Sequence, residues 1–447
     1  MHFLLKTGVF FDKICVYRYN WGVHMLYKDK ISTRATALYY PDFKEENSSR
    51  RWYQHDIDTI IYSDPFRKMQ RKSQLLSIYD PVSRSRLIHT FEVVRIAKEI
   101  SEKLELNTEL TEAIALAHDF GNVAYGKCAD LFLQAKTSRR FKHEDVSALM
   151  LKVCASRPIP DKYRELARKA ISKNKNTTHL ISISEFPKEL EVYQGDNDIH
   201  YVCISPEVLD GIRKHGTKLC AHTLEGQVVN YADNIAYLIQ DINDFEISGI
   251  FNARTKERYG RCLNDLKKVD RNKETPITGV VGKTTSIRTA TLIERFVSFN
   301  KKQLLKGTLP TIKSPFFSKE IPQLQIDPLL TKAIDLCWEF KKEFYDHELI
   351  KISNVTSSCK MEQLWDILNE DSAFTKNNKS YISFMKSLSS PIFESYKKEK
   401  KFKDERSWEQ WKKAYFIAHL TCDEIDLIIK SFLERDYEFH LALPTFK

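Results

Sequence analysis

Glycine and proline are scarce in this sequence, which has 13 Gly and 14 Pro among its 447 residues. That length would allow two or three domains, but no stretch rich in Pro, Gly or Ser divides the chain. The nine cysteines are spread along the sequence and include no C-x-x-C pair. They are typical of free thiols in a reducing compartment, and they argue against a disulfide framework or a zinc site.

Long apolar runs are also missing. No run approaches the roughly 20 residues that cross a bilayer, and Lys6, Asp12 and Lys13 interrupt the weakly apolar start of the chain. A signal peptide needs a continuous apolar core. We therefore expect a cytoplasmic protein that makes no membrane contact. Residues 1–24 are interpreted either as a small extension packed on the body or as a start assigned too far upstream.

The chain does have enough apolar material for a large core, with 42% hydrophobic and 12% aromatic residues. Its formal net charge of +10 is diffuse. The densest basic run, residues 397–406, mixes both signs and is typical of a solvated helix face. A basic balance also suits a polyphosphate substrate, and contact with nucleic acid is a weakly supported alternative.

Hydrophobic periodicity predicts two consecutive helices between residues 83 and 121. Ser83 or Ser85 is suited to cap a helix that runs to about Leu104. Thr108 is suited to cap the next helix, and Gly121 is expected to end it.

The rest of the chain is also mainly helical in pattern. A broad apolar stripe predicts a long helix over residues 225–245, and helical spacing returns from residue 326 onward. Residues 173–204 break the helical pattern. Residues 180–184 and 199–204 are β-prone, with turn residues at 194–198 between them, which predicts a short hairpin or an irregular insertion. The expected fold class is mainly α with a small β insertion.

Four side chains in these helical segments are suited to bind a metal ion. His118 and Asp119 follow an apolar helical run, His89 lies in an earlier helix, and Asp233 lies in a later one. Two imidazoles and two carboxylates suit a borderline or hard divalent cation that keeps open positions for water and a phosphate oxygen. On its own, a His-Asp doublet is more often a capped helix end, so the metal interpretation depends on the surrounding sequence.

The surrounding sequence resembles the HD-domain deoxyguanosine triphosphate triphosphohydrolases and related dNTP triphosphohydrolases. The segments that carry the resemblance follow the family's order and are residues 51–63, 66–74, 83–93, 118–119, 141–144 and 224–237. This resemblance implies an HD-domain helical bundle in residues 25–250. Residues 251–447, a loop-rich segment and a C-terminal helical region, would complete the fold. It also implies a homo-oligomer.

The resemblance implies that water attacks the α-phosphorus of a dNTP, with dGTP as the expected substrate, and that nucleoside and triphosphate leave. The four ligands would hold Mg, Mn, Fe or Co. Arg86, three residues before His89, would donate to phosphate oxygens with its fork geometry. By the same resemblance, Gln74 and Leu75 would meet the sugar or base, Tyr237 would pack on the deoxyribose, and Asp241 would bind its 3′-hydroxyl.

Four further residues are expected to act in catalysis. The resemblance places His143 near the reacting phosphate with Glu144 beside it, although the two could also be a surface pair. Asp130 stands at the family's acidic position. Lys127 stands where the family has its proposed catalytic histidine. A Lys ammonium can stabilise developing charge but shuttles protons poorly unless burial lowers its pKa.

Three functions therefore stay open at this point. The first is a dNTP triphosphohydrolase that favours dGTP. The second is another HD-type phosphohydrolase, acting on a monophosphate or a cyclic diester. The third is a nucleotide-binding sensor or assembly protein in which Lys127 leaves little turnover.

Overall fold

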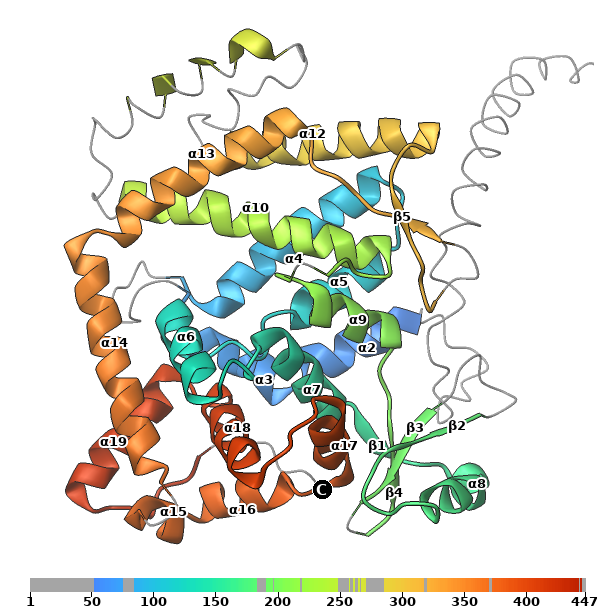
Figure 1. Cartoon of the computed structure of the whole chain (residues 1–447), viewed down its shortest axis with the longest axis vertical. Helices are drawn as coiled ribbons and strands as arrows, with labels where there is room; N and C mark the ends of the chain where they lie inside the picture. The colour runs from blue at the N-terminus through green and yellow to red at the C-terminus, as the bar shows by residue number, and fades with distance from the viewer. Residues whose placement is uncertain are drawn as a thin grey trace, which may run out of the picture.

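The computed structural model describes residues 52–74, 84–182, 190–195, 197–217, 219–247, 257, 260–261, 264–265, 267–270, 285–316, 320–369, 372–441 and 443. Over these residues the chain is mainly helical with two small antiparallel sheets, which confirms the predicted fold class (Figure 1). No helix within these ranges is long and apolar enough to cross a membrane. The predictions for residues 1–24 and for Leu75 lie outside the described residues.

Three helices form the centre of the molecule, α4 (Arg86–Lys103), α5 (Thr108–Ala117) and α10 (Leu224–Ile247). Each of them contacts the other two, and α10 lies beside α4 in Figure 1. Nearly all of α5 from Leu110 onward is buried. The residues that directly follow α5 are therefore carried into the interior, although two of them are polar. The helices around this centre are α2 (Trp52–Ile61), α3 (Asp64–Lys68), the 3-10 helix η2 (Met69–Arg71), α6 (Gly126–Lys136), α7 (His143–Cys154) and α9 (Pro206–Lys214).

The starts of α4 and α5 follow from local capping. Ser85 is the N-cap of α4, and its hydroxyl accepts a hydrogen bond from the backbone N–H of Ile88, which confirms one of the two predicted caps. The cap predicted for α5 is wrong by one residue. Asn107 is the N-cap, because its side-chain oxygen accepts from two backbone N–H groups of the first turn, and Thr108 is the first helical residue.

The end of α5 also differs from the prediction. The helix ends at Ala117 with His118 as its C-cap, so Gly121 does not terminate it. Gly121 instead permits close packing, because a Cβ atom there would collide with the backbone of His143 and Ser147 in α7. The turn after α5 can therefore pack directly against α7, which brings residues 118 and 119 close to residue 143.

The β-prone segment forms a four-stranded antiparallel sheet in the order β1-β4-β3-β2. Its strands are β1 (Ser156–Pro158), β2 (His179–Ile181), β3 (Leu190–Gln194) and β4 (Ile199–Val202). The two runs predicted as strands, residues 180–184 and 199–204, do not pair with each other, because β3 lies between β2 and β4 and pairs with both, with Gln194 opposite Ile199. Helix α8 (Asp161–Ile171) covers the sheet, and the two share a small hydrophobic core separate from the main one.

The C-terminal half adds helices to the same hydrophobic core, which includes residues from Tyr53 to Leu441. In Figure 1 these helices lie above α10, along the left side, and below α6 and α7. Stacked aromatic rings fill the layer around α18, where Trp408, Trp411 and Tyr415 follow one another along the helix. The elements are α12 (Thr285–Lys306), β5 (Thr311–Ile312), β6 (Ile321–Pro322), α13 (Pro328–Tyr345), α14 (Glu348–Ile367), α15 (Ala373–Asn377), α16 (Lys379–Ser387), α17 (Pro391–Glu399), α18 (Glu405–Ala418) and α19 (Cys422–Glu434).

A buried lysine joins the two halves. The Nζ atom of Lys72 donates to the carbonyls of Asn122 at 2.7 Å and Ala418 at 2.6 Å, and lies 3.5 Å from that of Phe120. Three carbonyl acceptors match the three N–H donors of an ammonium group. Burial lowers the pKa of Lys72 to about 7. The turn after α5 is thereby held against the end of α18.

Candidate active site

The four side chains predicted as metal ligands meet where α4, α5 and α10 converge. His89 comes from α4, His118 and Asp119 from the end of α5, and Asp233 from α10. From Asp233 Oδ1, the Nε2 atoms of His89 and His118 lie 3.0 and 3.8 Å away. Asp119 Oδ1 lies 3.5 Å from His118 Nε2, and Asp119 Oδ2 lies 3.8 Å from His89 Nε2. Ligand atoms bound to one cation at about 2.1 Å lie about 3.0–3.4 Å apart, so small side-chain shifts would complete a site.

Both histidines present Nε2 to the carboxylates; that of His89 lies at hydrogen-bond distance from Asp233, and that of His118 is unpaired. Nδ1 of His118 donates to the carbonyl of Ala115 at 2.7 Å, which leaves its Nε2 without a proton and pointing at the two carboxylates. That Nε2 is buried and has no hydrogen-bond partner. A buried acceptor without a donor costs free energy, and a bound cation would remove that cost. The donor set and this unpaired nitrogen fit a divalent cation.

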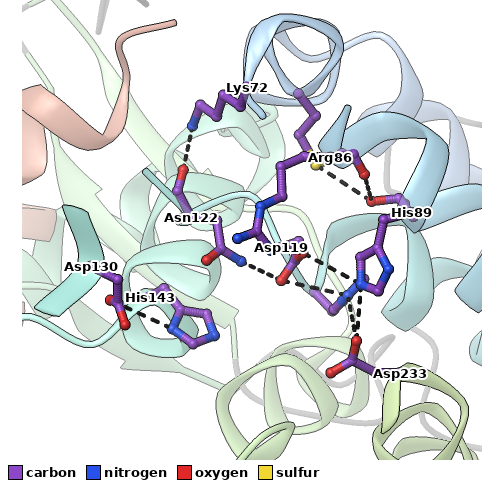
Figure 2. A network of polar contacts seen from close by, with 12 residues as sticks. Lys72, Arg86, His89, Asp119, Asn122, Asp130, His143 and Asp233 are labelled. Carbon is purple, nitrogen blue, oxygen red and sulfur yellow. Dashed lines mark hydrogen bonds and ion pairs between the residues drawn. The ribbon is translucent and has the colours of Figure 1, made fainter. Parts of the chain in front are cut away.

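The carboxylates are held in their charged form. Burial alone would raise the pKa of Asp119, but His118 and the guanidinium of Arg86 hold it well below its usual range. Arg86 Nη1 lies 3.0 Å from Asp119 Oδ2, and the amide of Asn122 donates to Asp119 Oδ1 (Figure 2). Despite burial, the hydrogen bond from His89 and the nearby His118 lower the pKa of Asp233 to about 2.

The predicted catalytic residues form a second group on α6 and α7. Asp130 Oδ2 accepts from Lys127 at 3.0 Å and from Gln134 at 2.9 Å, while its Oδ1 lies 3.9 Å from Nδ1 of His143. Glu144 lies beside the same imidazole, at 3.6 Å. His143 and Asp130 face each other on the opposite side of Asp119 from Asp233 (Figure 2). The side chain of Lys127 is 67% exposed, so it reaches this group from the surface.

The predicted sugar-binding residues are part of a buried network at the far end of α10. Asp241 is fully buried; Arg84 Nη2 donates to its Oδ1 at 3.0 Å, and the Tyr345 hydroxyl donates to its Oδ2 at 3.1 Å. The hydroxyls of Tyr345 and Tyr237 lie 2.6 Å apart. Burial and the charge of Asp241 raise the pKa of Tyr237 to about 12. Arg84 and Tyr345 had no recognisable signal in the sequence, because their role depends on how α4, α10 and α13 pack.

Gln74 is the remaining predicted substrate contact that the structure describes. Its side chain is buried, and its Oε1 has no hydrogen-bond partner. Gly126 has a positive φ of 66°, and a Cβ atom there would lie 3.0 Å from the Gln74 carbonyl. A larger residue at the start of α6 would therefore push against Gln74.

His215, which the sequence analysis did not single out, also faces the centre. It is the C-cap of α9, and its ring lies 5.2 Å from that of His118 and 5.4 Å from that of His143. Its Nε2 lies 4.0 Å from Asp119 Oδ1. Burial and the neighbouring His118 and His143 lower the pKa of His215 to about 4. The sequence did offer one signal for His215, because this residue directly follows an amphipathic helix, as His118 directly follows α5.

Comparisons with known proteins agree with this geometry. Residues 86–238, which include all four candidate ligands, match the HD domain family. This part of the chain is therefore similar to an HD domain, a kind of domain that binds divalent metals.

The relatives specify the kind of HD protein that the chain is similar to. It is 32% identical over 202 residues to a deoxyguanosinetriphosphate triphosphohydrolase-like protein of Caldanaerobacter subterraneus subsp. tengcongensis, covering 45% of this chain and 48% of the relative. A protein of the same name from Clostridium perfringens is 32% identical over 212 residues, covering 46% of this chain and 50% of the relative. One from Clostridium tetani is 29% identical over 275 residues, covering 60% and 62%. The resemblance seen in the motifs is confirmed, and the chain spans about half the length of the first two of these curated relatives.

Proposed function

We propose that this protein is a divalent-metal-dependent phosphohydrolase that converts deoxynucleoside triphosphates, dGTP foremost, to deoxynucleoside and triphosphate. The observation that supports this most strongly is the meeting of His118, Asp119 and their two partner ligands in one buried cluster. A bound cation would neutralise phosphate charge and lower the pKa of a coordinated water. The names of the relatives support dGTP as the first substrate to test.

Arg86 is suited to bind the reacting phosphate. One arm of its guanidinium pairs with Asp119, while its buried Nε has no hydrogen-bond partner. A guanidinium presents its donors in a rigid fork, so the pairing with Asp119 fixes the direction of the unused donor. Arg86 would therefore orient an anionic group beside the metal ligands.

His143 and Asp130 would handle protons on the leaving-group side. Asp130 is held by Lys127 and Gln134, so its remaining oxygen can orient the imidazole of His143. A positioned imidazole can protonate a leaving 5′-oxygen. Glu144 would help to keep the ring in place, and Lys127 would add positive charge from the surface.

The network at the far end of α10 would select the sugar. Tyr237 is held by Tyr345, and its ring lies 5.5 Å from that of Trp338, so it is a rigid wall. Such a wall would leave little room for a ribose 2′-hydroxyl. Asp241 would bind a 3′-hydroxyl only if Tyr345 released it, and Gln74 Oε1 would accept from the base or sugar.

The test is a panel of all dNTPs and NTPs with Mg, Mn, Fe or Co, in which anion-exchange chromatography separates triphosphate from pyrophosphate and phosphate. We expect triphosphate from dGTP, and little from GTP. Asp233→Asn should abolish it, whereas Asp161→Asn, at a side chain 89% exposed, should not.

Other outcomes would favour the alternatives. Release of phosphate from a monophosphate or cleavage of a cyclic diester would indicate a different HD phosphohydrolase. Binding of dNTP without any product would indicate a sensor. The homo-oligomer stays a prediction, which light scattering with and without dGTP would measure.

A further inference from the structure

Lys72 lies behind the metal ligands and takes no part in the proposed reaction. It is 1% exposed, and its ammonium group donates to the main-chain carbonyls of Asn122 and Ala418. Desolvation of a buried ammonium offsets much of the free energy that such hydrogen bonds return. Desolvation does not cancel the geometry, because an ammonium group fixes the directions of the carbonyls that it holds. The contact therefore matters for what the held segments carry.

One of these segments carries the metal ligand Asp119. Asn122, whose carbonyl accepts from Lys72, turns its side-chain amide toward Asp119 and donates to Oδ1 (Figure 2). The backbone N–H of Asn122 also donates to the carbonyl of Asp119, at 3.1 Å. A shift of the main chain at Asn122 would therefore move the donor that orients the carboxylate.

The other side of Asp119 leads back to Lys72. Arg86 Nη1 lies 3.0 Å from Asp119 Oδ2, and the backbone N–H of Arg86 donates to the carbonyl of Lys72 at 2.9 Å. Lys72, Asn122, Asp119 and Arg86 thus form a closed ring, joined by hydrogen bonds and one ion pair. Both partners that hold the Asp119 carboxylate in this ring are attached to Lys72.

The same ammonium group ties this ring to the C-terminal half. Ala418, whose carbonyl lies 2.6 Å from Lys72 Nζ, is the last residue of α18. Lys68, one helical turn before Lys72, holds the next carbonyl, that of His419 at 2.9 Å, and pairs with Glu424. In the described part of the chain, Lys68 makes no hydrogen bond to the turn after α5.

A purely structural role would make the two lysines equivalent. Both hold the end of α18, so the loss of either should loosen the contact between the two halves. Only Lys72 also holds the segment that carries Asp119. A difference between the two lysines would therefore report on the metal site and not on the stability of the fold.

We propose that Lys72 is a positioning residue of the metal site, which sets the orientation of Asp119 through Asn122 and so lets the C-terminal half determine how tightly the site binds a cation. A residue that orients a metal ligand typically contributes about 10–100-fold to metal affinity. Lys72 itself contacts neither the cation nor the substrate. Its effect on turnover rests on the proposed function, whereas its effect on metal affinity does not.

The test compares Lys72→Met with Lys68→Met in the full chain, at a temperature where circular dichroism shows both to be folded. Methionine fills the space of the lysine stem but donates no hydrogen bond. We expect Lys72→Met to bind Mn(II) about 10–100-fold more weakly than wild type, measured by calorimetry. Lys68→Met should bind Mn(II) as wild type does, although both variants should be less stable. If Lys72→Met does not fold, Lys72→Gln is measured in its place, with the same expectation.

A double-mutant cycle tests the route through Asn122. Asn122→Ala removes the amide that orients Asp119 but keeps the carbonyl that Lys72 holds. If Lys72 acts through this amide, adding Lys72→Met to Asn122→Ala should weaken Mn(II) binding by less than about twofold. Fully additive losses would overturn the proposal.

Results typical of a structural contact alone would also overturn it. These are an unchanged Mn(II) affinity in Lys72→Met, or equal losses of affinity in the Lys72 and Lys68 variants. Weaker Mn(II) binding by Lys72→Met, without triphosphate release by wild type, would sink the proposed function and leave the positioning role standing. Triphosphate release by wild type, with unchanged Mn(II) affinity in Lys72→Met, would do the reverse.

Discussion

At the end of α9, His215 is buried and donates from Nδ1 to a carbonyl of its own last turn; at the end of α18, His419 does the same. The surroundings differ. The ring of His215 faces Asp119 and two more histidines, whereas that of His419 packs between Phe384 and Tyr415. Lys68 and Lys72 add positive charge near His419, and this charge would repel a metal cation.

The difference shows that local helix geometry does not make a histidine a ligand. In both places the helix end sets the tautomer and leaves Nε2 as the outward atom. Only the neighbours supplied by other helices decide whether that atom meets a carboxylate or an aromatic ring. The predictions below test this contrast, from the largest expected effect to the smallest.

The first prediction compares His118→Gln with His419→Gln. His118→Gln should weaken divalent-metal binding by at least about 100-fold, since loss even of a group that only supports a ligand costs 10–100-fold. Triphosphate release should disappear with the metal. His419→Gln should keep both, although its thermal stability should fall. Equal metal affinities in the two variants, by calorimetry with Mn, would break the contrast.

The second prediction concerns Lys72, which joins the two regions. Lys72→Met fills the space of the stem but leaves the carbonyls of Asn122 and Ala418 without donors. We expect the free energy of unfolding to fall by about 2–3 kcal/mol, measured by urea denaturation. Lys169→Met, at a side chain 74% exposed, is the matched control and should change little. A more stable Lys72→Met protein would mean that burying the ammonium costs more than its bonds return.

The third prediction concerns pH and the buried ring of His419. Burial lowers the pKa of His419 to about 3, against about 6.5 in an unfolded chain. Between these values the unfolded chain binds more protons than the folded one. The free energy of unfolding should therefore fall as the pH drops from 6.5, by at most about 1.4 kcal/mol per pH unit from this ring.

The measurement is urea denaturation from pH 7 to pH 4 in the presence of a chelator, for wild type and His419→Gln. The variant has no ring to protonate, so its stability should fall less steeply with acid. Parallel curves would show that His419 takes up protons equally in the folded and the unfolded chain, so that burial does not lower its pKa.

The smallest expected effect is at Lys127. Its side chain is 67% exposed, so solvent screens its pairing with the buried Asp130, and a pair screened in this way contributes about 0–1 kcal/mol. Lys127→Ala should therefore leave metal content unchanged and lower kcat by less than about tenfold. Lys127→His should retain activity and move the pH optimum toward neutral, because imidazole titrates there. Three superimposable pH profiles would remove any role for Lys127 in the reaction.

Much of the centre was predictable from the sequence because its determinants are local. The His118-Asp119 doublet follows an apolar helix, and the segments around His89 and Asp233 match known motifs in order and spacing. The cap at Ser85 was also predictable, since it depends on a few neighbouring residues, whereas the pairing of the β strands was not, because β3 inserts between the two runs predicted to pair. The cap at Asn107 was misplaced by one position, because Thr108 has nearly the same capping preference.

What the sequence determined by itself is the helical class, the HD motif and the residue types that can bind a cation. Only the tertiary structure decided which polar groups meet: His215 with Asp119, Tyr345 with Asp241, and Lys72 with the end of α18. Periodicity reports which face of a helix is buried, but not which atom of another helix it meets there. That choice depends on packing between segments far apart in the chain, and here it separates a histidine that can bind metal from one that only fills space.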